Sequence, residues 1–476
     1  MLPRVRYDVV VVGGGTAGSV LAARLSENPD RSVCLLEAGP DYGHLADGRW
    51  PAEILDAREM PWTHGWGPGD PDDGRLGARI IGGCSSHNAC VVLSGSPGDY
   101  DEWGPGWNFE SFAPFIERAR KGLRTQPRNT DDPGPLHVAF VEGARSLGFP
   151  LLADPDDPSA PVGVAPYPAN VVDGTRCNAA IAYLDPARER SNLTILGEAT
   201  VDRVILEGSR ASGVVRADGQ RVEAEAVILA AGAYFSPLIL CRSGIGPENE
   251  LSRLGIRVVE SLPVGERLLD HCGIGIDWTM ADPGHDAVAP HEAEHGLYES
   301  HLVIKAASTH CAAGSWDLHF MPWVGWNETT GRQEPGLGLF HVKPLSTGSV
   351  RLRSADPSEL PLVERGFLSD DEDLDVLLEG VEIARSLAAT NPLRDFVGAE
   401  VAPGERDPAE YVRETVSNYF HPAGTCALGS VVDTHGRVFG VDGVYVADAS
   451  FMPTIPRANT NLTTAAIAER IAADLA

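Results

Sequence analysis

Gly13, Gly15 and Gly18 have the spacing of a loop that binds a dinucleotide, and Glu37 follows about 20 residues later. Gly13 allows a tight turn, Gly15 lets a pyrophosphate approach the backbone, and Gly18 lets a helix pack closely on a strand. A carboxylate at the position of Glu37 can accept hydrogen bonds from an adenosine ribose. These residues predict a dinucleotide site; a glycine-rich turn followed by a surface glutamate is the alternative.

The elements around these residues favour the dinucleotide site. Residues 7–12 are a short, β-branched apolar run that stops at glycine, as a buried parallel strand does. A helical pattern covers residues 19–26 and a second apolar strand covers residues 32–37, which completes one βαβ unit. Apolar runs at 226–232 and 444–448 predict further strands beside it. The expected fold class is α/β, with a Rossmann-like parallel sheet.

The middle of the chain has a different pattern. Residues 349–353 alternate between polar and apolar, which is typical of an antiparallel strand, and residues 373–389 have the periodicity of an amphipathic helix. We therefore expect a second, α+β domain that is built on an antiparallel sheet and binds the substrate. The predicted dinucleotide domain is discontinuous (1–90, 186–275 and 425–476), and the predicted substrate domain has residues 91–185 and 276–424.

Composition excludes several classes of protein. The chain has 476 residues, which favours two domains, and a net charge of −29, which argues against nucleic acid or an anionic membrane surface as a partner. Its eight cysteines contain no CxxC pair, so we expect reduced thiols in a cytoplasmic protein. The first strand begins at Tyr7, which leaves no room for a signal peptide. No apolar run reaches the roughly 18 residues of a membrane span, and no metal site is predicted.

Four groups of segments, taken together, resemble the glucose–methanol–choline (GMC) family of FAD-dependent oxidoreductases. They are residues 13–18 with 37–39, residues 82–90, residues 232–237, and residues 421–426 with 446–450 and 459–463. They follow the family's order over nearly the whole chain, and residues 82–90 are most similar to the choline oxidase-like members. The resemblance implies FAD as cofactor and a small-molecule alcohol, primary or secondary, that is oxidised to a carbonyl compound.

His421 and Asn459 occupy the positions that face the flavin in the family. The resemblance therefore assigns His421 as the general base that removes the hydroxyl proton while a hydride moves to flavin N5. An imidazole suits this task because its ordinary pKa is near 6.5. The amide of Asn459 can stabilise the alkoxide by a hydrogen bond. A lone histidine is more often a surface or core residue, so the inference depends on the motif and on Asn459.

His87 stands where the choline oxidase-like members bond a histidine ring nitrogen to the flavin 8α-methyl carbon. The resemblance implies such a tether here; a polar contact to a non-covalent flavin is the alternative. A helix predicted over residues 464–476 follows Asn459, and its positive end can stabilise reduced flavin. The residues expected to contact the cofactor are Gly13, Gly15, Thr16, Ala17, Gly18, Glu37, Ala38, Gly82, Gly83, Ser86, His87, Asn88, Ala89, Val201, Ala231, Gly232, Asp448, Ala449, Asn461, Leu462 and Thr463.

Aromatic residues Trp62, Trp323 and Phe420 are candidates for the substrate pocket, with core packing as the alternative. Glu299 could hold a cationic substrate, although a solvated surface position is the usual place for a glutamate. Ala89 and Phe420 replace a serine and a tyrosine of choline oxidase-like members, which argues against choline itself as the substrate.

Two other functions share this pattern. One is a non-redox flavoprotein lyase on the same fold, such as a hydroxynitrile lyase. The other is an inactive binding protein, against which the presence of both His421 and Asn459 speaks. The residues do not distinguish O2 from a quinone or protein carrier as the acceptor of the electrons.

Overall fold

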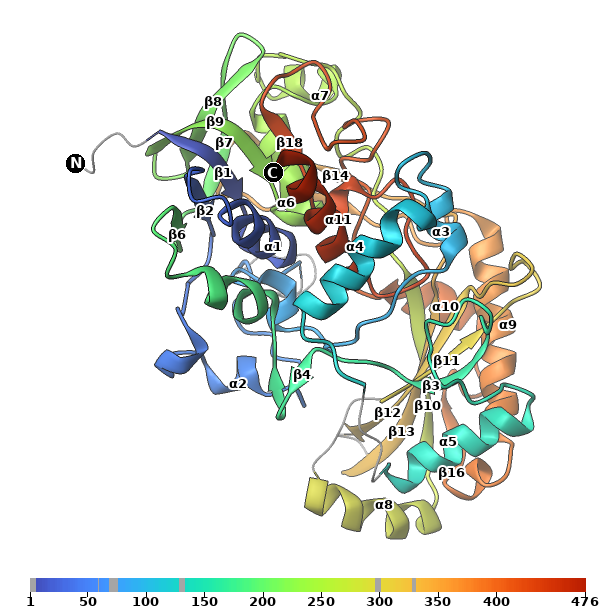
Figure 1. The fold of residues 1–476 in the computed structure, drawn as a ribbon. Helices are drawn as coiled ribbons and strands as arrows, with labels where there is room; N and C mark the ends of the chain where they lie inside the picture. The colour runs from blue at the N-terminus through green and yellow to red at the C-terminus, as the bar shows by residue number, and fades with distance from the viewer. Residues whose placement is uncertain (1–5, 59, 68–75, 128–132, 296–300, 328–330) are drawn as a thin grey trace.

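The computed structural model describes residues 6–58, 60–67, 76–127, 133–295, 301–327 and 331–476 (Figure 1). Its two large sheets lie at opposite ends of the molecule, and helices pack against both of them. Among the described residues, no helix combines the length and the apolar character that crossing a membrane needs.

The first sheet confirms the Rossmann-like prediction. Its seven strands follow the order β6-β2-β1-β9-β8-β7, with β18 paired to β9. The pairs β1–β2, β1–β9, β2–β6 and β9–β18 are parallel, and β7, β8 and β9 form an antiparallel meander. The strand bounds are β1 (Tyr7–Val12), β2 (Val33–Leu36), β6 (Leu193–Leu196), β7 (Val201–Glu207), β8 (Arg210–Arg216), β9 (Arg221–Leu229) and β18 (Val444–Val446).

Helices cover the parallel strands, which explains why these strands are apolar on both faces. Helix α1 (Thr16–Leu25) packs beside α11 (Thr460–Leu475), and α4 (Phe109–Gly122) packs on α11 (Figure 1). Helix α6 (Gly232–Arg242) follows β9 and packs against β7. Together they bury one large apolar core.

The second sheet is antiparallel throughout, as predicted, in the order β16-β10-β13-β12-β11-β3, with β17 paired to β10. Helices α5 and α9 pack on it and close a second core. The bounds are β3 (Gly163–Pro166), β10 (Cys272–Met280), β11 (Leu302–Ala306), β12 (Leu318–Asn327), β13 (Arg332–His341), β16 (Val397–Ala402), β17 (Ser417–Asn418), α5 (Pro135–Ser146), α8 (Asp282–His295), α9 (Asp371–Ala388) and α10 (Pro408–Thr415).

Some elements differ from their predicted positions. Helix α11 begins at Thr460 rather than 464, with Asn459 as its N-cap residue. Strand β14 (Ser349–Arg351) does not join the second sheet: it pairs with β15 (Leu362–Glu364), and its Val350 belongs to the first core. Helix α4 also packs in the first core, although its residues were expected in the substrate domain. The other α-helices and β-strands of the described residues are α2 (Ala52–Leu55), α3 (Pro97–Asp101), α7 (Glu248–Arg253), β4 (Val171–Val172) and β5 (Thr175–Arg176).

Candidate active site

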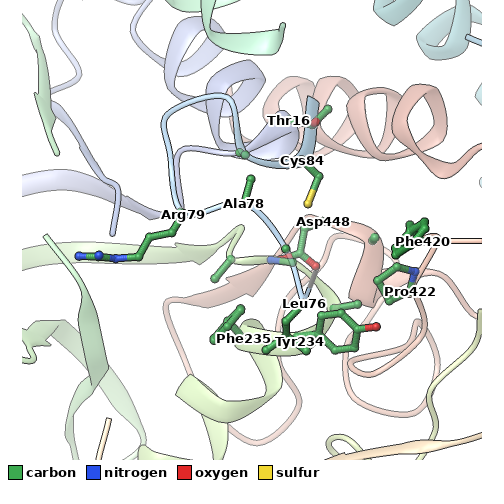
Figure 2. Close-up of a pocket in the computed structure, with 18 of the residues that line it drawn as sticks. Thr16, Leu76, Ala78, Arg79, Cys84, Tyr234, Phe235, Phe420, Pro422 and Asp448 are labelled. Carbon is green, nitrogen blue, oxygen red and sulfur yellow. The ribbon is translucent and has the colours of Figure 1, made fainter. Parts of the chain in front are cut away.

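A cavity of about 710 Å³ begins at the carboxyl ends of the parallel strands and extends to the second sheet. Val12, Leu36 and Ala230 line it where β1, β2 and β9 end, which is where ligands bind in open parallel sheets. In Figure 2, Arg79 lies at one end of the pocket and Phe420 at the other. The cavity is therefore long enough in one direction to connect the dinucleotide motif with the predicted catalytic pair.

The glycine loop forms the dinucleotide end of the cavity. Gly13 has a φ of +99°, and a Cβ on Gly18 would lie 1.8 Å from the carbonyl oxygen of Gly13. Gly18 therefore does not line the cavity; it lets α1 pack on the loop. Glu37 accepts hydrogen bonds from the amides of Gly14 (2.7 Å) and Gly39 (2.8 Å), and burial raises the pKa of its carboxyl to about 7. The cavity is lined here by Gly13, Gly15, Thr16, Ala17, Glu37, Ala38 and Val201.

A second glycine loop packs against the first, and the amide of Gly82 donates to the carbonyl of Gly14 at 2.7 Å. A Cβ on Gly83 would lie 2.6 Å from the Cα of Gly15, so the two backbones approach as closely as glycine permits. Gly82 and Ser86 do not line the cavity; Ser86 donates a hydrogen bond to the carbonyl of Ile81 (3.0 Å) and so shapes the turn. The lining residues of this loop include Gly83, His87, Asn88 and Ala89.

His87 is buried at the wall of the cavity, and the ring of Trp62 lies edge-on to it with centroids 5.8 Å apart. Burial lowers the pKa of His87 to about 4, with smaller effects from the charges of Arg176 and His64. The imidazole is therefore neutral at physiological pH, and one ring nitrogen carries a lone pair.

The C-terminal segments close the cavity from the other side. Asp448 accepts hydrogen bonds from the amide of Gly232 (2.8 Å) and the hydroxyl of Ser236 (2.5 Å), and burial raises its pKa. Asn461 accepts a bond from Thr16 (2.7 Å), while its buried Nδ2 has no partner among the described residues. Ala231, Gly232, Asp448, Ala449 and Asn461 line the cavity.

Leu462 and Thr463 do not line the cavity. Because α11 begins at Thr460, both residues belong to the helix itself. Leu462 lies in the first core, and Thr463 is hydrogen-bonded to the hydroxyl of Tyr100 at 3.0 Å. They hold the start of α11 in place, so that Asn459 and Asn461 face the cavity.

His421 and Asn459, the predicted catalytic pair, are in contact at the other end of the cavity. The Nδ2 of Asn459 lies 3.1 Å from the Nε2 of His421. The backbone amide of His421 donates to Asp270 at 2.8 Å. Burial lowers the pKa of His421 to about 3, which keeps the ring neutral and able to accept a proton. The Oδ1 of Asn459 is buried without a partner among the described residues.

His271 is a site residue that the sequence motifs did not indicate. Its Nδ1 lies 2.9 Å from the Nδ1 of His421, and its Nε2 lies 3.1 Å from the carbonyl oxygen of Pro456. It comes directly before β10, outside the four groups of motifs. The only signal in the sequence was a histidine at the start of an apolar strand, which is too common to indicate a function.

Aromatic rings surround the histidine end of the cavity. Phe420 and Trp62 pack with centroids 5.5 Å apart, Phe340 and Tyr419 stack at 3.6 Å, and Trp323 also lines the wall. Phe420 has a φ of +61°, in the left-handed region that a bulky residue seldom adopts. Phe420, Trp62 and Trp323 thus line the cavity together, and their contact with a substrate stays a prediction. Glu299 lies outside the described residues.

These features define a class of protein: a dinucleotide-dependent oxidoreductase whose cofactor cavity ends at a neutral histidine. Comparison with known proteins then identifies the family. The GMC oxidoreductase N-terminal model matches residues 7–273 and the C-terminal model matches residues 344–468. The chain belongs to the GMC oxidoreductase family, as the sequence motifs indicated.

Several relatives match over nearly the whole chain. Human mitochondrial choline dehydrogenase is 32% identical, covering 98% of this chain and 89% of the relative. The oxygen-dependent choline dehydrogenase of Paraburkholderia phymatum is 33% identical, covering 98% and 92%. Among solved structures, pyridoxine 4-oxidase from Mesorbium loti has a TM-score of 0.86 and 28% identity, covering 98% of this chain and 99% of its own. None of these proteins is named as a lyase.

The cavity fits the cofactor of the family, FAD. Gly13, Gly15 and Gly83 line the cavity without side chains, so a pyrophosphate can approach their backbone, and the Nδ2 of Asn461, which has no partner among the described residues, offers a donor at the start of α11. Glu37 lines the cavity, and each of its two carboxylate oxygens accepts a hydrogen bond from one backbone amide, which leaves lone pairs for the ribose hydroxyls at the adenosine end. The protein is an FAD-dependent oxidoreductase that acts on the CH–OH group of a small-molecule alcohol.

Proposed function

We propose that this enzyme oxidises a primary alcohol whose CH2OH carbon is attached to a flat, apolar or aromatic group. The observation that carries the proposal is the position of the His421 Nε2 atom, paired with Asn459 at 3.1 Å, at the aromatic end of the FAD cavity. No other described side chain of the cavity combines a neutral basic nitrogen with a neutral amide donor in contact.

The reaction divides between these two residues and the cofactor. The Nε2 lone pair of His421 accepts the hydroxyl proton, and the amide of Asn459 turns from His421 toward the developing alkoxide oxygen as a hydrogen-bond donor. FAD, when bound, supplies a two-electron acceptor for the hydride of the same carbon. The alcohol thereby loses a proton and a hydride, and a carbonyl bond forms. The His421 ring is itself buried, so bulk water has little access to the nitrogen that accepts the proton.

The walls of the cavity favour an uncharged, flat substrate. Phe340, Tyr419 and Phe420 offer ring faces and edges against which an aromatic group packs. The described carboxylates of the lining are Glu37, Glu359 and Asp448. Glu37 and Asp448 accept hydrogen bonds from backbone amides at the carboxyl ends of the parallel strands, and neither is hydrogen-bonded to His421.

A choline-like substrate is the second candidate. It is favoured by the choline dehydrogenases that match over 98% of this chain, and because aromatic rings also bind quaternary ammonium groups. The replacement of serine and tyrosine by Ala89 and Phe420 speaks for the uncharged alcohol instead. Both substrates use the same His421 and Asn459.

The test is anaerobic flavin absorbance with benzyl alcohol, pyridine-methanols, aliphatic alcohols and choline added one at a time. We expect rapid bleaching by the ring-bearing alcohols and little by choline, and the His421→Ala variant should lose the bleaching. Bleaching by choline alone would overturn the substrate class. Bleaching of His421→Ala at the wild-type rate would overturn the mechanism.

We also propose that His87 is bonded through a ring nitrogen to the 8α-methyl carbon of the flavin. Its neutral ring, its burial at the cavity wall and its place in the motif support this. Forming the bond removes one hydrogen from the methyl carbon and one from the ring nitrogen, and the two electrons leave through the acceptor used in turnover. Acid precipitation should give a yellow pellet, and His87→Ala should give a colourless pellet with free FAD in the supernatant. A colourless wild-type pellet would refute the bond.

The electrons pass in turn to O2 or to a quinone or protein carrier. Reoxidation of the bleached enzyme by air-saturated buffer within turnover time would identify an oxidase, and persistence of the bleached state would identify a dehydrogenase. A cytoplasmic location stays a prediction of the sequence.

A further inference from the structure

We propose that His271 is a positioning residue that holds His421 in the tautomer with a proton on Nδ1 and a lone pair on Nε2. The inference rests on the proposed function of His421 as base, and it follows from the hydrogen-bond chain behind that residue. His271 lies on the side of His421 away from Asn459, so it acts through His421 and not on the substrate.

The chain of bonds has only one consistent assignment of protons for two neutral rings. The carbonyl oxygen of Pro456 can only accept, so the Nε2 of His271, 3.1 Å away, carries a proton. The Nδ1 of His271 then holds a lone pair. The Nδ1 of His421, 2.9 Å from that atom, must therefore be the donor, which leaves the lone pair of His421 on Nε2. The carbonyl of Pro456, at the other end of this series of hydrogen bonds, thus determines that the lone pair of His421 lies on Nε2, the nitrogen that contacts Asn459.

Asn459 agrees with this assignment from the opposite side. Its Nδ2 can only donate, and it lies 3.1 Å from the Nε2 of His421. The hydrogen bonds through His271 also require that the Nε2 of His421 is an acceptor. Pro456 and Asn459 belong to the same short segment before α11, so one segment makes contact with both ends of the histidine pair.

The backbone explains why two histidines meet here. Residues 269–272 pair antiparallel with 418–423 through the contacts of Leu269 with Ala423 and of Cys272 with Asn418. The second segment has more residues between these contacts than the first, so it bulges. Phe420, with its φ of +61°, lies in the bulge and turns the following His421 back toward His271.

Burial keeps His271 neutral, as the assignment requires. The residue is fully buried, and burial followed by the positive charges that His421, His319 and His341 can carry lowers its pKa well below the ordinary value. Asp270, the acidic neighbour, accepts the backbone amide of His421 and lies 3.9 Å from Arg365. The histidine pair therefore holds one proton on each ring and can take one more only at the Nε2 of His421.

Two substitutions of His271 each keep one of its hydrogen bonds: one keeps an acceptor in the place of Nδ1, and the other keeps a donor in the place of Nε2. In His271→Asn, the amide oxygen can take the place of Nδ1 and accept the proton of His421. In His271→Gln, the longer amide can reach the carbonyl of Pro456 but leaves no acceptor at the Nδ1 position. His341→Gln is the matched control, since His341 is also buried and bonds to Asp373 at 3.2 Å rather than to His421.

The measurement is anaerobic stopped-flow reduction of the bound flavin, which separates the limiting rate from the substrate Kd. We expect the limiting rates of His271→Asn and His341→Gln to stay within about threefold of wild type. His271→Gln should lose at least about tenfold in limiting rate with an unchanged Kd. This loss is part of the factor of roughly 10²–10⁴ that a general base contributes. Equal losses in His271→Asn and His271→Gln would overturn the proposal, because a merely structural role does not distinguish the two.

Nitrogen-15 spectra of histidine-labelled wild-type enzyme keep the test independent of variants that fail to fold. Signals absent from the His421→Ala spectrum belong to His421, and they should show a protonated Nδ1 and a lone pair on Nε2. The reverse tautomer would overturn the role of His271 directly. If the flavin of His421→Ala is reduced at the wild-type rate while His421 has the proposed tautomer, His421 is not the base and the proposed function fails, although His271 still sets the tautomer. The failure of the proposed function and the failure of the positioning role are therefore distinguishable.

Discussion

Asn459→Asp tests the electrostatics of the catalytic pair most directly. The substitution keeps the size of the side chain and places a carboxylate where the amide donor now lies, 3.1 Å from the Nε2 of His421. At that distance and an effective dielectric constant of about 20, a full charge pair gains about 5 kcal/mol, which corresponds to about 4 pKa units. Desolvation of the new carboxylate offsets part of this gain, so we expect the pKa of His421 to rise by about 1–3 units.

The direction of the pH effect follows from the role of His421. A base works only when it is deprotonated, and burial lowers the pKa of His421 to about 3 in the native site. The wild-type reduction rate should therefore not fall through protonation of His421 until the pH is well below 5. In Asn459→Asp, the rate should fall as the pH drops through a window near 4–6, the native value raised by the expected shift of about 1–3 units. The introduced carboxylate also repels the alkoxide at every pH, at a cost of about 10²–10³ in rate.

Asn459→Ala is the control, because it removes the donor without adding a charge. It should lose a similar factor of about 10²–10³ and keep the wild-type pH profile. The assay is the limiting rate of anaerobic flavin reduction between pH 4.5 and 9, with flavin content checked for each variant. Identical pH profiles for the two variants, or a rate for Asn459→Asp within tenfold of wild type, would refute the assignment of these two roles.

Two further predictions concern the dinucleotide end of the cavity. Gly83→Ala should reduce the FAD content sharply, because the new Cβ would lie 2.6 Å from the Cα of Gly15. Gly48→Ala is the control: Gly48 has a similar positive φ and nothing within 4 Å of a Cβ, so this variant should lose only about 1–2 kcal/mol of stability through backbone strain. Equal FAD content in the two variants would contradict the prediction. Burial raises the pKa of Glu37 from 4.5 to about 7, so between these two pH values the folded apoprotein holds a proton that the unfolded chain has released. The free energy of unfolding of the apoprotein should therefore fall by up to about 3 kcal/mol as the pH rises from 4.5 to about 7. Glu37→Gln should flatten this dependence in urea unfolding, and an unchanged slope would assign it to other groups.

The elements that the sequence predicted correctly are those whose information is local. The βαβ unit depends on a β-branched run, a glycine loop and a helix that are neighbours in the chain, so its pattern survives without any knowledge of the rest. The pair of His421 and Asn459 came from motifs rather than from geometry. The structure brings the two residues into contact, and the roles assigned to them stay predictions until the rates are measured.

What the sequence did not indicate depends on contacts between distant segments. The residues of α4 were assigned to the substrate domain with the rest of 91–185, whereas α4 packs in the first core, because the apolar face of a helix does not show which sheet it packs against. The start of α11 is supported by Thr16 and Tyr100, which hold Asn461 and Thr463, rather than by a side-chain cap. Such contacts leave no periodic or compositional signal in either partner.

The low pKa of His421 is consistent with its role as a base because the value belongs to the site without substrate. Burial penalises the imidazolium, which keeps Nε2 free of solvent protons. When a substrate hydroxyl lies against Nε2, proton transfer creates the alkoxide and the imidazolium together, and each charge then stabilises the other at hydrogen-bond distance. The basicity of His421 therefore increases only as the reaction proceeds, which is the condition for binding the transition state more tightly than the ground state. His271 contributes by presenting a lone pair to the Nδ1 proton of His421, so that the positive charge is hydrogen-bonded on both ring nitrogens at the moment it forms.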